Sequence, residues 1–183
     1  MNPESTRLPR RSAADTTGKN HDILVNLESS GEDLTILRLL ANSPTLLRPM
    51  VMMANALMQR ATLSPLDREV LVLHLAVRLE NSYEWDEHVS LSVAAGVTDE
   101  QRDALLAREP IEPPLFTGAQ KLAVALADEI IDTGALSDAT WERAATVWGD
   151  AAALDLLLSV GFWGGMVPIV TAGLGLAQSK PRG

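Results

Sequence analysis

Glu84 and His88 are the residues of this sequence whose types and spacing most clearly suit chemistry. An α-helix turns once in about 3.6 residues, so two side chains four positions apart share one face. The stripe beside them is apolar and consists of Trp85, Val89 and Val93. A carboxylate beside an imidazole at the edge of an apolar wall is suited to proton transfer, because desolvation raises the pKa of a carboxyl group and the carboxylate stabilises the charged ring.

A second set of titratable residues interrupts an apolar stretch just before this pair. Glu69, His74 and Arg78 lie within the run SPLDREVLVLHLAVRLE, which would otherwise bury nearly every face of a helix. Ser64 followed by Pro65 is typical of a helix start, since serine caps the first turn and proline fits its first position. We therefore expect a helix over 64–80, followed by one over 82–95 that ends at Gly96.

Composition excludes several classes of function. The 183 residues contain no cysteine, which removes thiolate nucleophiles, disulfides and cysteine metal sites. No HExxH motif, phosphate-binding glycine loop or nucleophile elbow occurs, so no metal site is expected. A net charge of −9 argues against nucleic acid and anionic membrane surfaces as partners.

Helical periodicity extends along the rest of the chain, and no strand pattern competes with it. Aromatic residues make up only 4% of the sequence, which favours helices packed through aliphatic side chains. The further helices are expected over 32–41, 44–60, 98–108, 117–133, 137–148 and from about 150 onward. The helix over 44–60 carries Met50, Met52, Met53 and Met58, which either contact a ligand or belong to the core.

The two ends of the chain differ from its middle. Residues 1–20 lack apolar periodicity and are expected to form a flexible tail or arm, with one domain over 21–183. Arg10 and Arg11 are followed by SAADTTGKN and not by the apolar stretch of an export signal, so we expect a cytoplasmic protein. Residues 156–177 carry no charge; a buried helix that closes an oligomer is favoured over a membrane span.

One block of the sequence resembles a known family. LSPLDREVLVLHLAVRLENSYEWDEHVSLSVAAGVTDEQRDAL, residues 63–105, is similar to carboxymuconolactone decarboxylase-like proteins, a superfamily that also contains the alkylhydroperoxidase-D enzymes. The peroxidase branch has a glutamate, eleven residues and then CxxCxxxH. Aligning His88 with that histidine places Glu69 on the glutamate, whereas Asn81 and Glu84 replace the two cysteines. Thiol peroxide chemistry is therefore excluded on chemical grounds.

The resemblance implies an all-α subunit, a multi-helix orthogonal bundle of the alkylhydroperoxidase-D-like type, that assembles as a homo-oligomeric trimer or hexamer. It also implies a cofactor-free lyase or isomerase acting on a small lactone or carbonyl substrate. In this hypothesis His88 is the general acid or base, Glu84 its orienting partner or a second base, and Glu69 a support. The residues expected to contact the substrate are Tyr83, Trp85, His74 and Met53.

Two alternatives remain open at this stage. The same scaffold could serve a cyclase or isomerase of a secondary-metabolite pathway, in which the methionine-rich helix shapes a larger pocket. The protein could also be a non-enzymatic ligand-binding or assembly module, with Glu84 and His88 forming an ordinary surface pair. The burial of these two side chains distinguishes the catalytic hypotheses from this last one.

Overall fold

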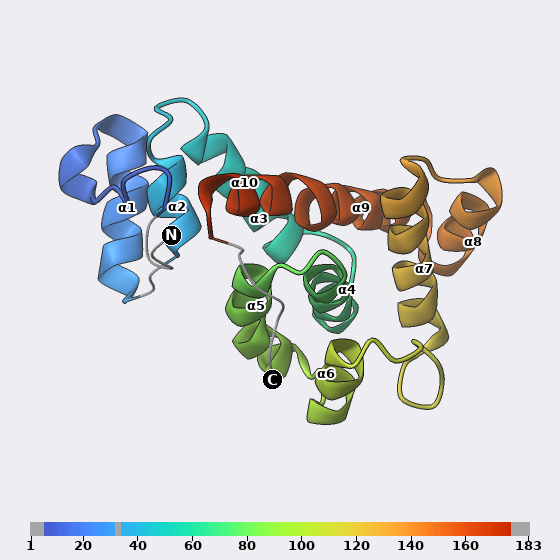
Figure 1. Ribbon diagram of the computed structural model, residues 1–183. Helices are drawn as coiled ribbons and strands as arrows, with labels where there is room; N and C mark the ends of the chain where they lie inside the picture. Colours follow the sequence, from blue (N-terminus) through green and yellow to red (C-terminus); the bar gives the residue numbers. More distant parts are fainter. Residues whose placement is uncertain (1–5, 32–33, 177–183) are drawn as a thin grey trace. The chain divides into compact units, whose positions relative to one another are not determined.

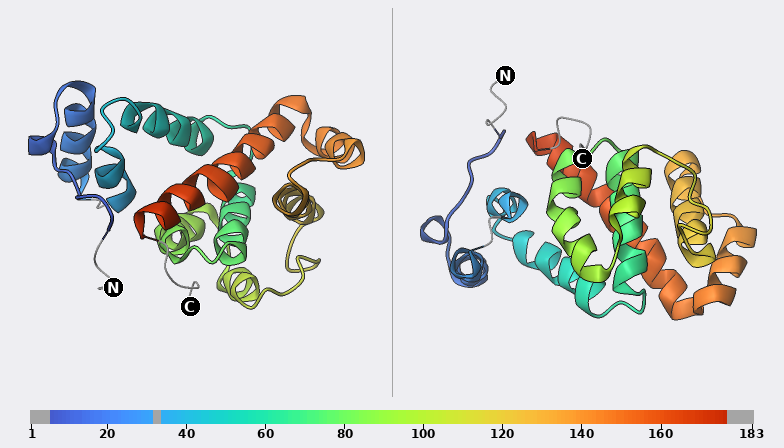
Figure 2. Two further views of the ribbon diagram at one scale, coloured as in Figure 1. Left: turned by 45° about the horizontal axis from the view of Figure 1, so that its top comes forward. Right: turned by 90° about the horizontal axis from the view of Figure 1, so that it is seen from below.

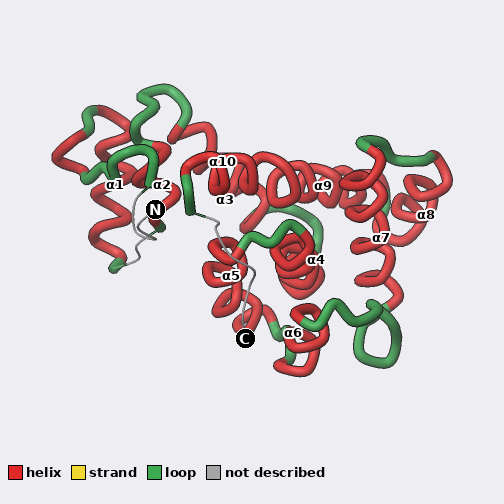
Figure 3. Tube along the Cα trace, viewed as in Figure 1, coloured by secondary structure: helices red, strands yellow, loops and turns green. Residues whose placement is uncertain are grey.

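The computed structural model describes residues 6–31 and 34–176, and every regular element in these ranges is a helix (Figures 1 and 3). This confirms the all-α prediction. Contacts divide the chain into two compact units. The described part of the first unit is residues 6–31, 34–60 and 173–176, and that of the second is residues 61–172. The single domain over 21–183 that the sequence suggested stays a prediction.

The first unit contains a 3₁₀ turn and three α-helices around a small aliphatic core. These are η1 (Ala13–Asp15), α1 (Gly18–Ser30), α2 (Thr35–Leu40) and α3 (Leu47–Gln59). Leu24, Leu27 and Leu47 are buried together in this core. The helix expected over 44–60 begins only at Leu47, because residues 44–46 form a turn.

Part of the expected tail has regular structure, namely η1 and the start of α1. The backbone N–H of Ser12 donates to Asp15, and the side chain of Asn20 donates to the carbonyl of Ser43 at 3.2 Å. Residues 1–5 of the expected tail lie outside the described residues. Helix α1 was not expected from the sequence, since it buries few apolar side chains.

The second unit is built around α4 (Pro65–Arg78), whose apolar residues are buried on nearly every face. The helices α5 (Ser82–Ala95), α6 (Asp99–Leu106) and α7 (Gly118–Thr133) pack on it, and α8 (Asp138–Trp148) packs on α7. Helices α4 and α5 lie side by side, and α7 also packs on α4 (Figure 2). Because α4 and α5 pack on each other, side chains of the two helices meet along their shared face.

The helix ends of this unit follow the capping signals in the sequence. Ser64 accepts from the backbone N–H of Asp67, as expected for an N-cap. Thr98 and Thr117 each form a capping box with the glutamine three residues later. Gly96 and Gly134 end α5 and α7 in the left-handed conformation, which glycine adopts without strain. The helix start at Ser64 and the helix end at Gly96, which the sequence predicted, are confirmed.

The last helical segment is continuous from Asp150 to Leu174. It consists of α9 (Asp150–Gly161), a π-helical turn η2 (Phe162–Met166) and α10 (Val167–Leu174). Within the described residues this segment is long and apolar enough to cross a membrane, with a mean hydropathy of 1.7 over its most apolar window. Core helices of soluble proteins pass the same test, so length and composition do not decide between the two.

Candidate active site

Glu69 of α4 and His88 of α5 form the centre of the candidate site. Nδ1 of His88 lies 2.8 Å from Oε2 of Glu69, and both side chains are buried. Glu69 is fully shielded from solvent, because α5 and the C-terminal helical segment cover this face of α4. Since the carboxylate can only accept, we assign the proton to Nδ1, which leaves Nε2 of the ring as the free polar atom.

Arg68 compensates the charge of Glu69. Its Nε donates to Oε1 of Glu69 at 3.1 Å, so the two carboxylate oxygens have different partners. Arg68 is itself 7% exposed, and a buried ion pair is tolerated only where further hydrogen bonds satisfy both members. Arg68, Glu69 and His88 therefore form one hydrogen-bonded chain that fixes the orientation of the imidazole.

Glu84 faces the other nitrogen of the ring. Its Oε2 lies 3.7 Å from Nε2 of His88, one helical turn away on α5, and its side chain is buried. Burial raises the pKa of Glu84 to about 7, an effect that the charge of His88 partly offsets and that of Glu87 reinforces. The protonation state of Glu84 therefore changes near neutral pH, whereas an exposed carboxyl group is fully ionised there.

Neighbouring elements hold Glu84 and His88 in place. Asn81 caps α5 by accepting from the backbone N–H of Glu84, and its amide donates to Oγ1 of Thr171 at 3.0 Å. The indole of Trp163, in the π-helical turn, meets the ring of His88 edge-on, with centroids 5.9 Å apart. The turn approaches α4 closely at Gly164, where the side chain of Leu75 leaves little space for a Cβ atom.

Sequence reasoning missed two members of this site. Arg68 carried a usable signal, because a charged residue beside Glu69 in an otherwise apolar helix needs a partner. Trp163 carried none, since its contact with His88 depends on how the C-terminal segment packs against α5. Among the described residues, no group of three or more His, Cys, Asp or Glu side chains is arranged to hold a metal ion.

The remaining predicted residues lie in different places. Trp85 is buried in the core among Val70, Leu73 and their neighbours. Tyr83 is partly exposed on the first turn of α5. Met53 is 37% exposed on α3, in the first unit. A contact of these three with substrate stays a prediction.

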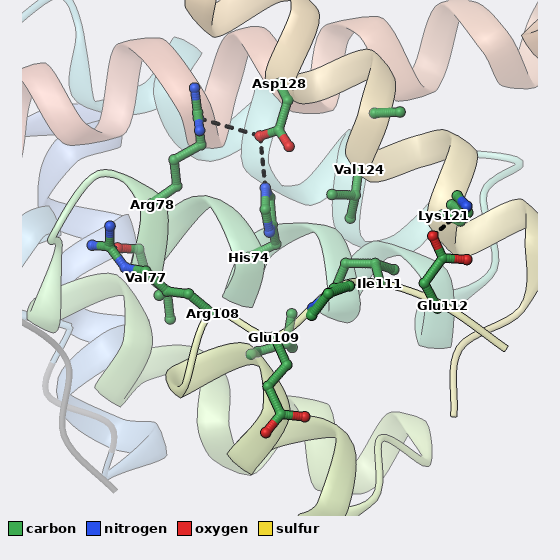
Figure 4. Close-up of a pocket in the computed structure, with 13 residues that line it drawn as sticks. His74, Val77, Arg78, Arg108, Glu109, Ile111, Glu112, Lys121, Val124 and Asp128 are labelled. Carbon is green, nitrogen blue, oxygen red and sulfur yellow. Dashed lines mark hydrogen bonds and ion pairs between the residues drawn. The ribbon is translucent and has the colours of Figure 1, made fainter. Parts of the chain in front are cut away.

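His74 points away from this site. Nε2 of His74 is 2.8 Å from Oδ1 of Asp128 on α7, and the ring lines a different pocket (Figure 4). Positions 69 and 74 are five residues apart and therefore lie on different faces of α4. The structure thus brings Glu69, Glu84 and His88 together and leaves His74 outside the group.

Comparison with known proteins agrees with the resemblance seen in the sequence. Residues 44–129 match the model of the carboxymuconolactone decarboxylase family, a range that contains Glu69, Glu84 and His88. The resemblance to this family is thereby confirmed. No curated protein sequence is significantly similar to the chain.

The fold itself has a solved counterpart. An uncharacterized peroxidase-related protein from Silicibacter sp. TM1040 has a similar structure, with a TM-score of 0.75. The two sequences are 19% identical, and the match covers 98% of this chain and 93% of the other. At this identity the likeness shows the fold.

Proposed function

We propose that this protein is a cofactor-independent lyase or isomerase that transfers protons on a small carbonyl or lactone substrate. The observation that supports the proposal is the pairing of His88, oriented by Glu69, with a buried Glu84 whose pKa is about 7. General acids and bases work best when their pKa lies near the working pH. The family match suggests a decarboxylase-like function, which needs such groups and no cofactor.

The geometry favours a particular division of roles. Glu69 is the closer partner of His88 and orients it, whereas the sequence alone gave this role first to Glu84. Glu84 is then free to act as the second acid or base. In a decarboxylation the bond to the departing carboxylate breaks, carbon dioxide leaves, and the electron pair moves into a neighbouring carbonyl as an enolate. Glu84 then gives its proton to the enolate carbon, since Nε2 of His88 carries no proton in the tautomer that Glu69 selects.

A peroxidase-related activity is the second candidate, because the structural neighbour is described as a peroxidase-related protein. Two-cysteine peroxide reduction requires a thiolate and a resolving thiol, and these 183 residues contain neither. Asn81 instead caps α5, and Glu84 provides a carboxyl group. Acid–base chemistry therefore fits the side chains of this site better than thiol chemistry.

The proposal is tested by the exchange of protons on candidate substrates in D₂O, followed by NMR. β-Keto acids and unsaturated lactone acids are the probes, and loss of carbon dioxide is followed in parallel. General acid–base catalysis contributes about 10²–10⁴-fold, so Glu84→Gln and His88→Asn should each slow the reaction by about that factor. Glu142→Gln, an exposed carboxyl on α8, is the matched control and should react as the wild type does.

Two results would contradict the proposal. Near-wild-type rates for both Glu84→Gln and His88→Asn, with unchanged helicity, would show that the chemistry lies elsewhere. Steady reduction of a hydroperoxide with a dithiol, above that of heat-denatured protein, would instead favour the peroxidase-related alternative. Stoichiometric oxidation of methionine does not count as turnover.

The proposal includes a cytoplasmic homo-oligomer. Several apolar side chains of the C-terminal segment are exposed in the single chain: Leu154, Leu158, Met166 and Ile169. Ile169 is 74% exposed, although its segment carries no charge from Leu156 onward. A contact with a second copy of the chain would remove this apolar surface from water.

A further inference from the structure

A pocket of about 370 Å³ is lined by His74, Val77 and Arg78 of α4, and none of Glu69, Glu84 and His88 lines it (Figure 4). Its walls come from α4, from α7 and from the segment that follows α6, all within the second unit. Its volume falls within the range of small-molecule sites, which is about 300–1,000 Å³. Neither Glu84 nor His88 lines it, so it is separate from the proposed chemistry.

One wall carries a histidine held by an aspartate. Nε2 of His74 lies 2.8 Å from Oδ1 of Asp128, and Nε of Arg78 lies 3.2 Å from the same oxygen. Figure 4 shows the linked side chains of His74, Asp128 and Arg78 along one side of the pocket. Within the described residues, Nδ1 of His74 has no hydrogen-bond partner. This nitrogen is not one of the fully buried polar atoms that lack a partner, so it is accessible. The pocket therefore presents a polar atom whose orientation Asp128 fixes.

Arg108 and Lys121, two further residues that line the pocket, carry hydrogen-bond donors that the protein does not use. Arg108 donates to the carbonyl of Val77 at 3.0 Å and to Glu80 at 3.4 Å, and both contacts use Nη2. Its Nε and Nη1 have no partner among the described residues, and its side chain is half exposed. Lys121 pairs with Glu112 through one oxygen, which leaves further ammonium donors.

Two of the three acidic groups of the pocket already belong to ion pairs. The charged residues that line it are Arg78, Arg108, Lys121, Glu109, Glu112 and Asp128. Oδ1 of Asp128 is engaged by His74 and Arg78, and Oε1 of Glu112 by Lys121, so Glu109 is the acidic side chain without an ion-pair partner among the described residues. Arg108 and Lys121 keep charged donors for a ligand, and Leu105, Ile111 and Val124 provide an apolar surface in the same pocket.

We infer that this pocket binds a small carboxylic acid with an apolar body, at a site distinct from the proposed acid–base centre. The carboxylate accepts from Nη1 of Arg108, because a hydrogen bond from a charged donor to a carboxylate is about twice as strong as a neutral one. The hydrocarbon part lies against Ile111 and Val124. His74 contacts the polar part of the ligand through Nδ1.

The test uses benzoate as the probe and benzamide as its uncharged counterpart. Titration calorimetry of the whole protein should show saturable binding of benzoate and at least about tenfold weaker binding of benzamide, since hydrogen bonds to charged groups are worth about twice neutral ones. With ¹³C-labelled isoleucine methyl groups, the signal of Ile111 should shift on titration. Arg108→Gln should weaken benzoate binding about tenfold, and His74→Gln should weaken it less.

Matched variants separate this site from other sources of binding. Arg143→Gln, an exposed arginine on α8, should leave the affinity unchanged, and so should Glu84→Gln in the candidate active site. Equal binding of benzoate and benzamide, an unmoved Ile111 methyl signal, or unchanged affinity in Arg108→Gln would each overturn the inference. Because the expected result does not depend on Glu84, loss of the proposed catalytic function would leave this test intact.

Discussion

Replacing Glu84 by glutamine should make the free energy of unfolding fall less as the pH rises. Burial raises the pKa of Glu84 from 4.5 to about 7, so the folded state binds a proton at pH values where the unfolded chain has lost it. The contribution of Glu84 to stability is therefore complete below about pH 4.5. It declines as the pH rises towards 7, and above about pH 7 it is fully lost. Glutamine resembles the protonated carboxyl group and does not titrate.

The magnitude follows from the two pKa values. Each tenfold change in the ionisation equilibrium corresponds to about 1.4 kcal/mol, so the span from 4.5 to about 7 corresponds to at most about 3 kcal/mol. Between pH 4.5 and pH 8 the wild-type protein should lose up to about this much more stability than Glu84→Gln. The sign is set by desolvation, which opposes the charged form of the folded protein.

The assay is urea unfolding at a series of pH values from 4.5 to 8, followed by tryptophan fluorescence. Trp85 and Trp163 are buried in the second unit and report on its unfolding. Glu142→Gln is the control for the loss of one carboxyl group and should follow the wild type at every pH. If Glu84→Gln also follows the wild type across this range, Glu84 ionises as an ordinary surface carboxyl group, and its proposed role loses its physical basis.

Three further predictions concern stability and assembly. Glu69→Ala removes the carboxylate that accepts from Nε of Arg68 and Nδ1 of His88, and should cost about 3–5 kcal/mol in the free energy of unfolding. A change below about 1 kcal/mol would contradict the buried ion pair. Gly164→Ala brings a Cβ atom within 3.1–3.2 Å of two side chains and should lower the free energy of unfolding by about 1–3 kcal/mol. Gly165→Ala, with open space around its Cβ atom, is the control. Equal effects of the two substitutions in urea unfolding would refute the close approach. Light scattering should give a mass of at least three chains, and a mass of 19.7 kDa would refute the proposed assembly.

Local signals in the sequence predicted much of the second unit. Capping residues and apolar periodicity act over a few positions, so Thr98, Thr117 and Gly96 define helix ends without knowledge of the fold. Helix α1 was missed because it buries little apolar surface, and its place depends on contacts such as that of Asn20 with Ser43. Its stability comes from tertiary packing, which periodicity does not report.

The candidate site shows the same limit. Spacing along α5 correctly placed Glu84 and His88 on one face, because helix geometry fixes that relation. Spacing could not show that Glu69 is nearer to His88 than Glu84 is, since this depends on how α4 and α5 pack. The apolar stripe beside Glu84 indicated the direction of its pKa shift, whereas the extent of that shift depends on burial by other elements.

The π-helical turn at Phe162–Met166 decides where the C-terminal segment can lose a residue without a change of register. A π turn contains one residue more than an α turn over nearly the same rotation, so deleting Gly165 would let the segment close into a regular α-helix with the later residues almost in place. Helix α10 has no such extra residue, and there each residue advances by about 100° around the axis. Deleting Ile169 would therefore turn Thr171 away from Asn81, the cap of the helix that carries Glu84 and His88. Single-residue deletions should thus be tolerated within the π turn and selected against in α10.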